Sequence, residues 1–267
     1  IMNNTFMSCS ASNDGGSIYI DTMNNKVMIS NNVISKSVAS YGGGIYIYNK
    51  NKNIVMRDNI FYDNSADNDG GAVFVYENND GLAVYSNTFD NCRAIDRGGG
   101  IMISDSNIQV SFSSNLFNNC SSMHGGGLYF DRNVNNTTIE HNKFTSCSAS
   151  HSGGGMYFNG NYKVIIHNNS FLHCSVYQSG CAIAMNAFNT DFNISHLIVD
   201  YCTIDNPGTF PTSIDDAGGA IYLGEHNRHV SIAKSFFANI ISYTYGAIAC
   251  MKYNEFIQIE GNKFERI

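Results

Sequence analysis

The sequence predicts an all-β solenoid, a chain that coils into stacked turns of parallel strands, and three observations predict it. A motif of two glycines, a small residue and an aliphatic residue returns every 27 or 28 residues. A second motif, Phe-x-x-Cys, returns with the same spacing. Between the motifs, apolar residues alternate with their neighbours at the two-residue period of a strand. Such a regular repeat indicates a fold in which each repeat packs against the next.

The first strand of each repeat follows the glycine pair. The small residue after the pair recurs at steps of 27, 28, 28, 27, 28, 27, 38 and 27 residues: Ser17, Gly44, Ala72, Gly100, Gly127, Gly155, Ala182, Ala220 and Ala247. Two aliphatic residues with one residue between them come next, as in Ile45, Tyr46 and Ile47. We expect the aliphatic pair to face the core and the middle residue to face outward.

Two more short strands complete each repeat. The second carries paired apolar residues seven and five positions before the Phe, such as Val110 and Phe112 before Phe117. The third holds the Phe itself. Asn stands two residues before the Phe column in eight of ten repeats: Asn4, Asn32, Asn59, Asn87, Asn115, Asn142, Asn169 and Asn262. We expect these amides to stack and bond the backbone at the corners, where the glycines allow tight turns.

Three short strands per repeat predict a right-handed single-stranded parallel β-helix of about nine turns, formed by residues 1–267 as one segment. At the usual strand spacing the rod is about 45 Å long. The one long step predicts a loop insertion at about 203–217, which contains Pro207 and Pro211. Because Ile1 and Ile267 fall in inward columns, we expect the chain to be part of a longer protein, whose open ends could also stack into a filament.

Five cysteines share one column on consecutive turns: Cys92, Cys120, Cys147, Cys174 and Cys202. One interpretation is a ladder of buried thiols that act as small apolar fillers. The other is one or two disulfides between stacked turns, in an oxidising compartment. A linear column lacks the tetrahedral geometry of a metal site, so we predict no metal and no cofactor.

Composition argues against two classes of partner. The net charge is −7 and charged residues make up 14% of the chain, whereas nucleic-acid binding needs clustered Lys and Arg. No apolar run reaches the length of a membrane span. Asn136 and Asn193 lie in glycosylation sequons and flank inward residues, so they are candidate sites of N-glycosylation in a secreted protein.

A carbohydrate-active enzyme on a pectate-lyase-like β-helix is an alternative to a binding protein. Glycoside hydrolysis needs two convergent carboxylates, and Asp215-Asp216 is the one adjacent acidic pair. The pair follows the predicted insertion, where it can simply close the loop. We therefore expect a protein that is not an enzyme.

The outward residues of the first strands form a candidate contact surface. They are mostly aromatic: Tyr19, Tyr46, Phe74, Tyr129, Tyr157 and Tyr222. Such a row can stack on sugars or anchor a protein partner. The alternatives are that the stacked rings stabilise the sheet, or that another part of the full chain covers them.

The repeats resemble those of the chlamydial polymorphic outer-membrane proteins. Gly70-Gly71-Ala72-Val73 and Phe61-Tyr62-Asp63-Asn64 match the two motifs of that family, and Gly218-Gly219-Ala220-Ile221 matches the first again. The resemblance covers the whole chain, but Cys replaces the last Asn in most repeats, and this form is more similar to related surface proteins of protists. The resemblance implies a right-handed β-helix displayed at a cell surface and active in adhesion.

Together these features predict an extracellular or cell-surface β-helix without enzymatic activity, acting as an adhesin or a structural stalk. Its partner would be a protein or glycan surface, or another copy of the chain. A structural subunit of an extracellular appendage or filament is the first alternative, and the carbohydrate-active enzyme is the second.

Overall fold

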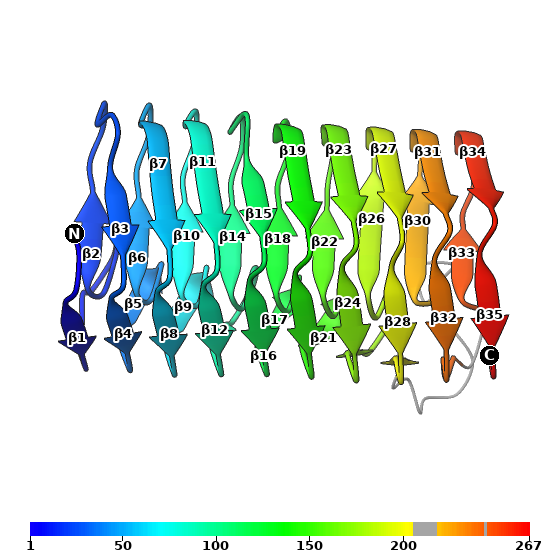
Figure 1. Ribbon diagram of the computed structural model, residues 1–267, viewed down its shortest axis with the longest axis horizontal. Helices are drawn as coiled ribbons and strands as arrows, with labels where there is room; N and C mark the ends of the chain where they lie inside the picture. Colours follow the sequence, from blue (N-terminus) through cyan, green and yellow to red (C-terminus); the bar gives the residue numbers. More distant parts are fainter. Residues whose placement is uncertain (205–217, 243–244) are drawn as a thin grey trace.

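The computed structural model describes residues 1–204, 218–242 and 245–267, which form a rod of about nine stacked turns (Figure 1). Every paired strand is parallel to its neighbours, and the strands form four sheets that run the length of the rod. The structure therefore confirms the predicted parallel β-helix. The described ranges contain no helix, and therefore none that is long and apolar enough to cross a membrane.

Sheet I contains the strands that follow the glycine pairs: β2 (Ile18–Ile20), β6 (Ile45–Ile47), β10 (Val73–Val75), β14 (Ile101–Ile103), β18 (Leu128–Phe130), β22 (Met156–Phe158), β26 (Ile183–Ala187), β30 (Ile221–Glu225) and β33 (Ile248–Cys250). Sheet II contains the second strands: β3 (Met28–Ser30), β7 (Lys52–Arg57), β11 (Asp80–Tyr85), β15 (Ser111–Ser113), β19 (Asn135–Glu140), β23 (Tyr162–His167), β27 (Thr190–Ser195), β31 (Arg228–Ala233) and β34 (Glu255–Glu260).

Sheet III contains the strands of the Phe column: β1 (Thr5–Met7), β4 (Val33–Ser35), β8 (Ile60–Tyr62), β12 (Thr88–Asp90), β16 (Leu116–Asn118), β20 (Lys143–Thr145), β24 (Ser170–Leu172), β28 (Ile198–Asp200), β32 (Phe236–Ala238) and β35 (Lys263–Glu265). Sheet IV precedes the glycine pairs: β5 (Val38–Tyr41), β9 (Ser65–Asp69), β13 (Arg93–Ala94), β17 (Ser121–His124), β21 (Ser148–Ser152), β25 (Ser175–Val176) and β29 (Thr203–Ile204).

Sheet IV is an addition to the three strands per turn that the sequence predicted. Its strands are short and rich in Ser and Ala, with few of the large apolar residues that mark the other three sheets. Its last strand, β29, also takes up Thr203–Ile204, the first two residues of the predicted insertion. The rest of that insertion, including Asp215 and Asp216, lies outside the described residues.

Stacked Phe rings fill the interior beneath sheet III. Phe89 and Phe117 have ring centroids 4.7 Å apart and planes 7° apart, and Phe117 and Phe144 are 4.8 Å apart. All three side chains are fully buried. From Phe61 to Phe171 each ring contacts the equivalent ring of the next turn, so this stretch of the column forms a continuous aromatic core.

The Asn column forms the predicted ladder at the corner before sheet III. The Asn115 Oδ1 atom accepts hydrogen bonds from the backbone N of Asn87 at 2.9 Å and from its Nδ2 at 3.1 Å. The Nδ2 atom of Asn115 donates to the Val84 carbonyl at 2.8 Å. A second Asn ladder lies between sheets I and II, where the backbone N of Asn51 donates to Asn79 Oδ1 at 2.9 Å. The sequence analysis overlooked this second ladder, although its spacing is equally regular.

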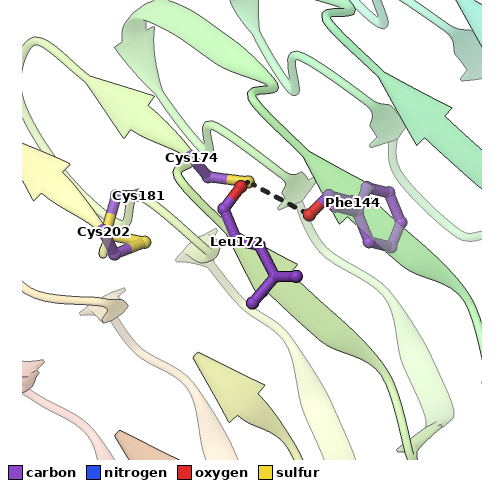
Figure 2. Close-up of a disulfide and its surroundings, with 5 residues drawn as sticks. All are labelled: Phe144, Leu172, Cys174, Cys181 and Cys202. Carbon is purple, nitrogen blue, oxygen red and sulfur yellow. Dashed lines mark hydrogen bonds between the residues drawn. A yellow bond between two sulfur atoms is a disulfide. The ribbon is translucent and has the colours of Figure 1, made fainter. Parts of the chain in front are cut away.

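Most of the Cys column is the predicted ladder of buried thiols, and no disulfide joins two of its members. Four members, Cys92, Cys120, Cys147 and Cys174, are free and fully buried. The fifth, Cys202, forms a disulfide with Cys181, so its assignment to the thiol ladder was wrong (Figure 2). Cys181 occupies the place of the second glycine of its repeat, so the bond joins two different columns rather than two stacked members of one.

Candidate binding groove

The groove lies where sheet IV turns into sheet I at the glycine pairs. The first glycine of a pair has a positive φ, +66° at Gly125, which favours glycine over other residues. A Cβ on the second glycine has no room, because at Gly126 it would lie 2.4 Å from the Gly154 carbonyl oxygen. This sharp corner brings the residue before the pair close to the middle residue of the sheet I strand in the next turn.

The residues before the glycine pairs form a column of polar side chains along the groove, in register from turn to turn. We call it the polar column: Asp14, Tyr41, Asp69, Arg97, His124, Ser152 and Ser179. Its members contact the rings of sheet I in the next turn. The Arg97 guanidinium lies 5.7 Å from the Tyr129 ring centroid, and the His124 ring lies 5.1 Å from that of Tyr157.

The aromatic row of sheet I is largely covered, contrary to the expectation of an open face. Five of its six members are only 4–8% exposed: Tyr46, Phe74, Tyr129, Tyr157 and Tyr222. Tyr19, at 47%, is the exposed member. The rings stack on one another, with Tyr129 and Tyr157 4.8 Å apart and 10° from parallel, and the polar column covers their other side. The row therefore stabilises sheet I, the alternative that the sequence analysis left open.

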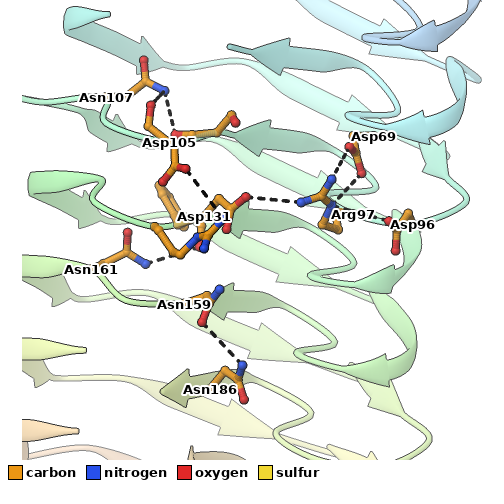
Figure 3. Close-up of polar contacts among 12 residues, drawn as sticks. Asp69, Asp96, Arg97, Asp105, Asn107, Asp131, Asn159, Asn161 and Asn186 are labelled. Carbon is orange, nitrogen blue, oxygen red and sulfur yellow. Dashed lines mark hydrogen bonds and ion pairs between the residues drawn. The ribbon is translucent and has the colours of Figure 1, made fainter. Parts of the chain in front are cut away.

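An ion cluster fills the groove around Arg97 (Figure 3). Its Nε and Nη2 atoms donate to the two carboxylate oxygens of Asp69 at 3.0 and 2.8 Å, and Nη1 donates to Asp131 at 3.2 Å. Asp69 is 2% exposed. Burial raises the pKa of Asp69, and the attraction of Arg97 opposes that shift. Burial likewise disfavours the charge of Arg97, but Asp69 outweighs it and the pKa of Arg97 rises. The cluster is thus a packing unit in which one guanidinium bridges two carboxylates of different turns.

Two histidines lie next to this cluster. The rings of His124 and His151 are 4.5 Å apart, and the buried Nδ1 atom of His124 has no hydrogen-bond partner. Burial, then His151 and then Arg97 lower the pKa of His124 to about 4, so its ring is neutral at pH 7. His151 Nδ1 lies 3.0 Å from Ser152 Oγ, which lies 3.0 Å from Ser179 Oγ. Beyond Arg97 the polar column is therefore uncharged at neutral pH across its described members.

A hollow of about 380 Å³ opens next to these serines. Seven residues line it: His151, Ser152, Tyr157, Gln178, Ser179, Asn186 and Tyr222. The Oε1 atom of Gln178 is buried and lacks a hydrogen-bond partner. A buried amide oxygen without a partner costs free energy, and this oxygen has almost no accessible surface of its own. The sequence predicted Tyr157 and Tyr222 as contact residues but gave no signal for Ser152, Gln178 and Ser179, because the residue before the glycine pair changes type from turn to turn.

The remaining predicted site residues lie elsewhere. Asn136 and Asn193 are exposed on sheet II, as a glycan acceptor requires, and lie outside the lining of the hollow. Among the described residues, no group of three or more His, Cys, Asp and Glu side chains is arranged to hold a metal ion.

Comparison with known proteins agrees with this architecture. A model of the right-handed beta-helix region matches residues 1–154, which is more than half of the chain. No curated protein matches the sequence. The chain belongs to the right-handed β-helix family.

Proposed function

We propose that this protein is a binding rod of the cell surface or the extracellular space, an adhesin or structural stalk without enzymatic activity. The observation that carries the proposal is the hollow in the groove, which combines aromatic walls with polar groups. A parallel β-helix with a stacked core holds such a surface rigidly, so a partner pays little ordering cost on the protein side.

Two further features support the location and the class. The Cys181–Cys202 disulfide is a weak indication of an oxidising compartment. The resemblance of the repeats to chlamydial polymorphic outer-membrane proteins, and to protist relatives with Cys in the second motif, points to surface display and adhesion.

The chemistry of the groove favours binding over catalysis. The carboxylates of Asp69 and Asp131 are both bonded to Arg97, which keeps them from acting as a free acid and base. Glycoside hydrolysis needs two carboxylates that face one scissile bond. The hollow instead presents hydroxyl and amide groups next to aromatic rings.

A binding screen tests this proposal. The purified protein is applied to an array that carries immobilised oligosaccharides and extracellular-matrix proteins. We expect saturable binding to at least one class of surface, reduced at least tenfold by Ser179→Arg, which would fill the hollow. Lys163→Arg on sheet II is the control and should bind like the original protein. Binding to no surface, or equal binding by Ser179→Arg and the original, would overturn the proposal.

A further inference from the structure

The free cysteines of the Cys column form an uninterrupted row of thiols in the core. The strands that flank them pair in register, with Asn118 opposite Thr145 and Ser121 opposite Ser148. Four consecutive turns therefore carry one fully buried thiol each, about 4.8 Å apart: Cys92, Cys120, Cys147 and Cys174. The row has three gaps between neighbouring sulfur atoms, and each gap lies between two equivalent side chains.

The four sulfur atoms also point the same way. Each Sγ atom contacts the carbonyl oxygen of the Phe in the preceding turn, at a distance between 3.5 and 3.8 Å. Figure 2 shows this contact between Cys174 and Phe144. Because the orientation is the same in every turn, the sulfur atoms repeat at the strand spacing. Burial, and then hydrogen bonds with the thiols of Cys147 and Cys92, raise the pKa of Cys120, so this thiol interacts with both neighbours and is protonated at pH 7.

This spacing suits a bridging metal ion better than a disulfide. A disulfide holds its Cβ atoms about 3.8 Å apart, whereas Cβ atoms in register on adjacent strands are about 4.8 Å apart. A metal–thiolate bond is about 2.3 Å long, as for zinc, so two such bonds in a line span about 4.6 Å. A linear column lacks the tetrahedral geometry that zinc needs, but a two-coordinate ion does not need it. Such a site has two ligands, and so differs from the sites of three or more ligands that the described residues lack.

The chemistry of the ligands selects the ion. Thiolates are soft ligands and favour soft ions such as copper(I), whose filled d shell accepts two ligands in a line. The core around the column is apolar, so a site that added net charge there would be costly. A singly charged ion that replaces one thiol proton adds none.

We propose that the thiol column binds copper(I), with one ion between each two successive sulfur atoms. For each ion, one S–H bond breaks, one S–Cu bond forms and the proton goes to solvent, while the next sulfur donates a lone pair to the same ion. Copper stays in the +1 state, so no electron is transferred. Three ions occupy the three gaps and displace three of the four protons, which leaves the net charge of the column unchanged. This site is independent of the groove and of the proposed binding function.

Copper loading during refolding tests the proposal, because the buried thiols are accessible before the core closes. The full chain, with its disulfide intact, is refolded without oxygen in the presence of copper(I) and then exposed to a chelator that removes copper from single thiols. We expect about three retained ions per chain and two sulfur neighbours per ion in X-ray absorption spectra. The melting temperature should be higher than that of the metal-free protein, because the ion binds only the folded column.

Substitutions locate the copper in the column. Cys120→Ala interrupts two of the three gaps and should lose about two-thirds of the retained copper. Cys250→Ala removes an exposed thiol outside the column and is the control, which should retain as much copper as the original protein. If Cys120→Ala does not fold, Cys174→Ala takes its place and should lose about one-third. No retained copper in the original, full retention in the folded column variant, or three or more sulfur neighbours per ion would overturn the proposal.

Discussion

The groove has two halves that share one backbone but differ in what fills them. In the first half, the Arg97 guanidinium and its carboxylates lie against the stacked rings of Tyr129 and Tyr157. In the second half, the polar column shrinks to Ser152 and Ser179, the ring row shrinks to Ala184, and a hollow of about 380 Å³ appears. The backbone is the same in both halves. The size of the side chains in the polar column and in the aromatic row therefore decides whether a stretch of the groove is filled or hollow.

The largest effect should come from breaking the closed half at Arg97. Arg97→Ala leaves the buried carboxylate of Asp69 without its cation, so we expect a loss of about 3–5 kcal/mol in the free energy of unfolding. Chemical denaturation measures it. The control, Arg57→Ala, removes the exposed pair with Asp58 and should cost less than about 1 kcal/mol. Equal losses in the two variants would show that the ion cluster is not a packing unit.

The second effect concerns the disulfide of the second half. Cys181 lies at the glycine corner, three residues before Ala184. Cys181→Ala removes the disulfide and should lower the free energy of unfolding by about 3 kcal/mol, because the unfolded chain gains freedom. Reductant should lower the stability of the original protein similarly. Cys120→Ala, in the thiol ladder, is the control and should respond to reductant like the original. A stability of the original that is insensitive to reductant would contradict this expectation.

The boundary between the halves should respond to pH through His124. Its pKa is about 4 in the fold and about 6.5 in an unfolded chain, so only the unfolded chain takes up a proton between these values. Stability should therefore be complete above about pH 6.5 and fall as the pH drops toward 4, by about 2 kcal/mol after allowing for partial exposure. His124→Gln should lose this component in denaturation curves recorded at pH 7 and pH 4.5. An unchanged difference between the two pH values would exclude His124 as its source.

The smallest effect should come from converting the open half into a closed one. Ala184→Tyr completes the ring stack and should raise the free energy of unfolding by up to about 1 kcal/mol, because aromatic pairs add to area burial. Ala249→Tyr, which extends the row from Tyr222, should give a similar or smaller gain. Thermal and chemical denaturation check both. A loss of more than about 2 kcal/mol in Ala184→Tyr would mean that the fold has no room for a ring at this position.

Particular residues show how far sequence reasoning reached. The Phe, Asn and glycine columns predicted the fold because each of these residues has a strong local role that recurs at a fixed spacing. Sheet IV escaped prediction because Ser and Ala carry little strand signal. The burial of Tyr46 and Tyr129 was not predicted either. The alternation of apolar residues shows which way a ring points, but not which side chains of another sheet pack on it. The bond from Cys181 to Cys202 joins two columns that are distant in the repeat pattern.

The sequence by itself determined the repeat, the parallel coil and the contents of the core columns, because in a solenoid each residue meets its own equivalent in the next turn. Only the tertiary structure decided how neighbouring columns meet across the glycine corner. There the contact joins residues of different kinds, such as Arg97 with Tyr129 and His124 with Tyr157. Because these residues are far apart in the repeat pattern, only their packing in the folded chain shows that large or charged side chains fill one half of the groove and small ones leave a hollow in the other.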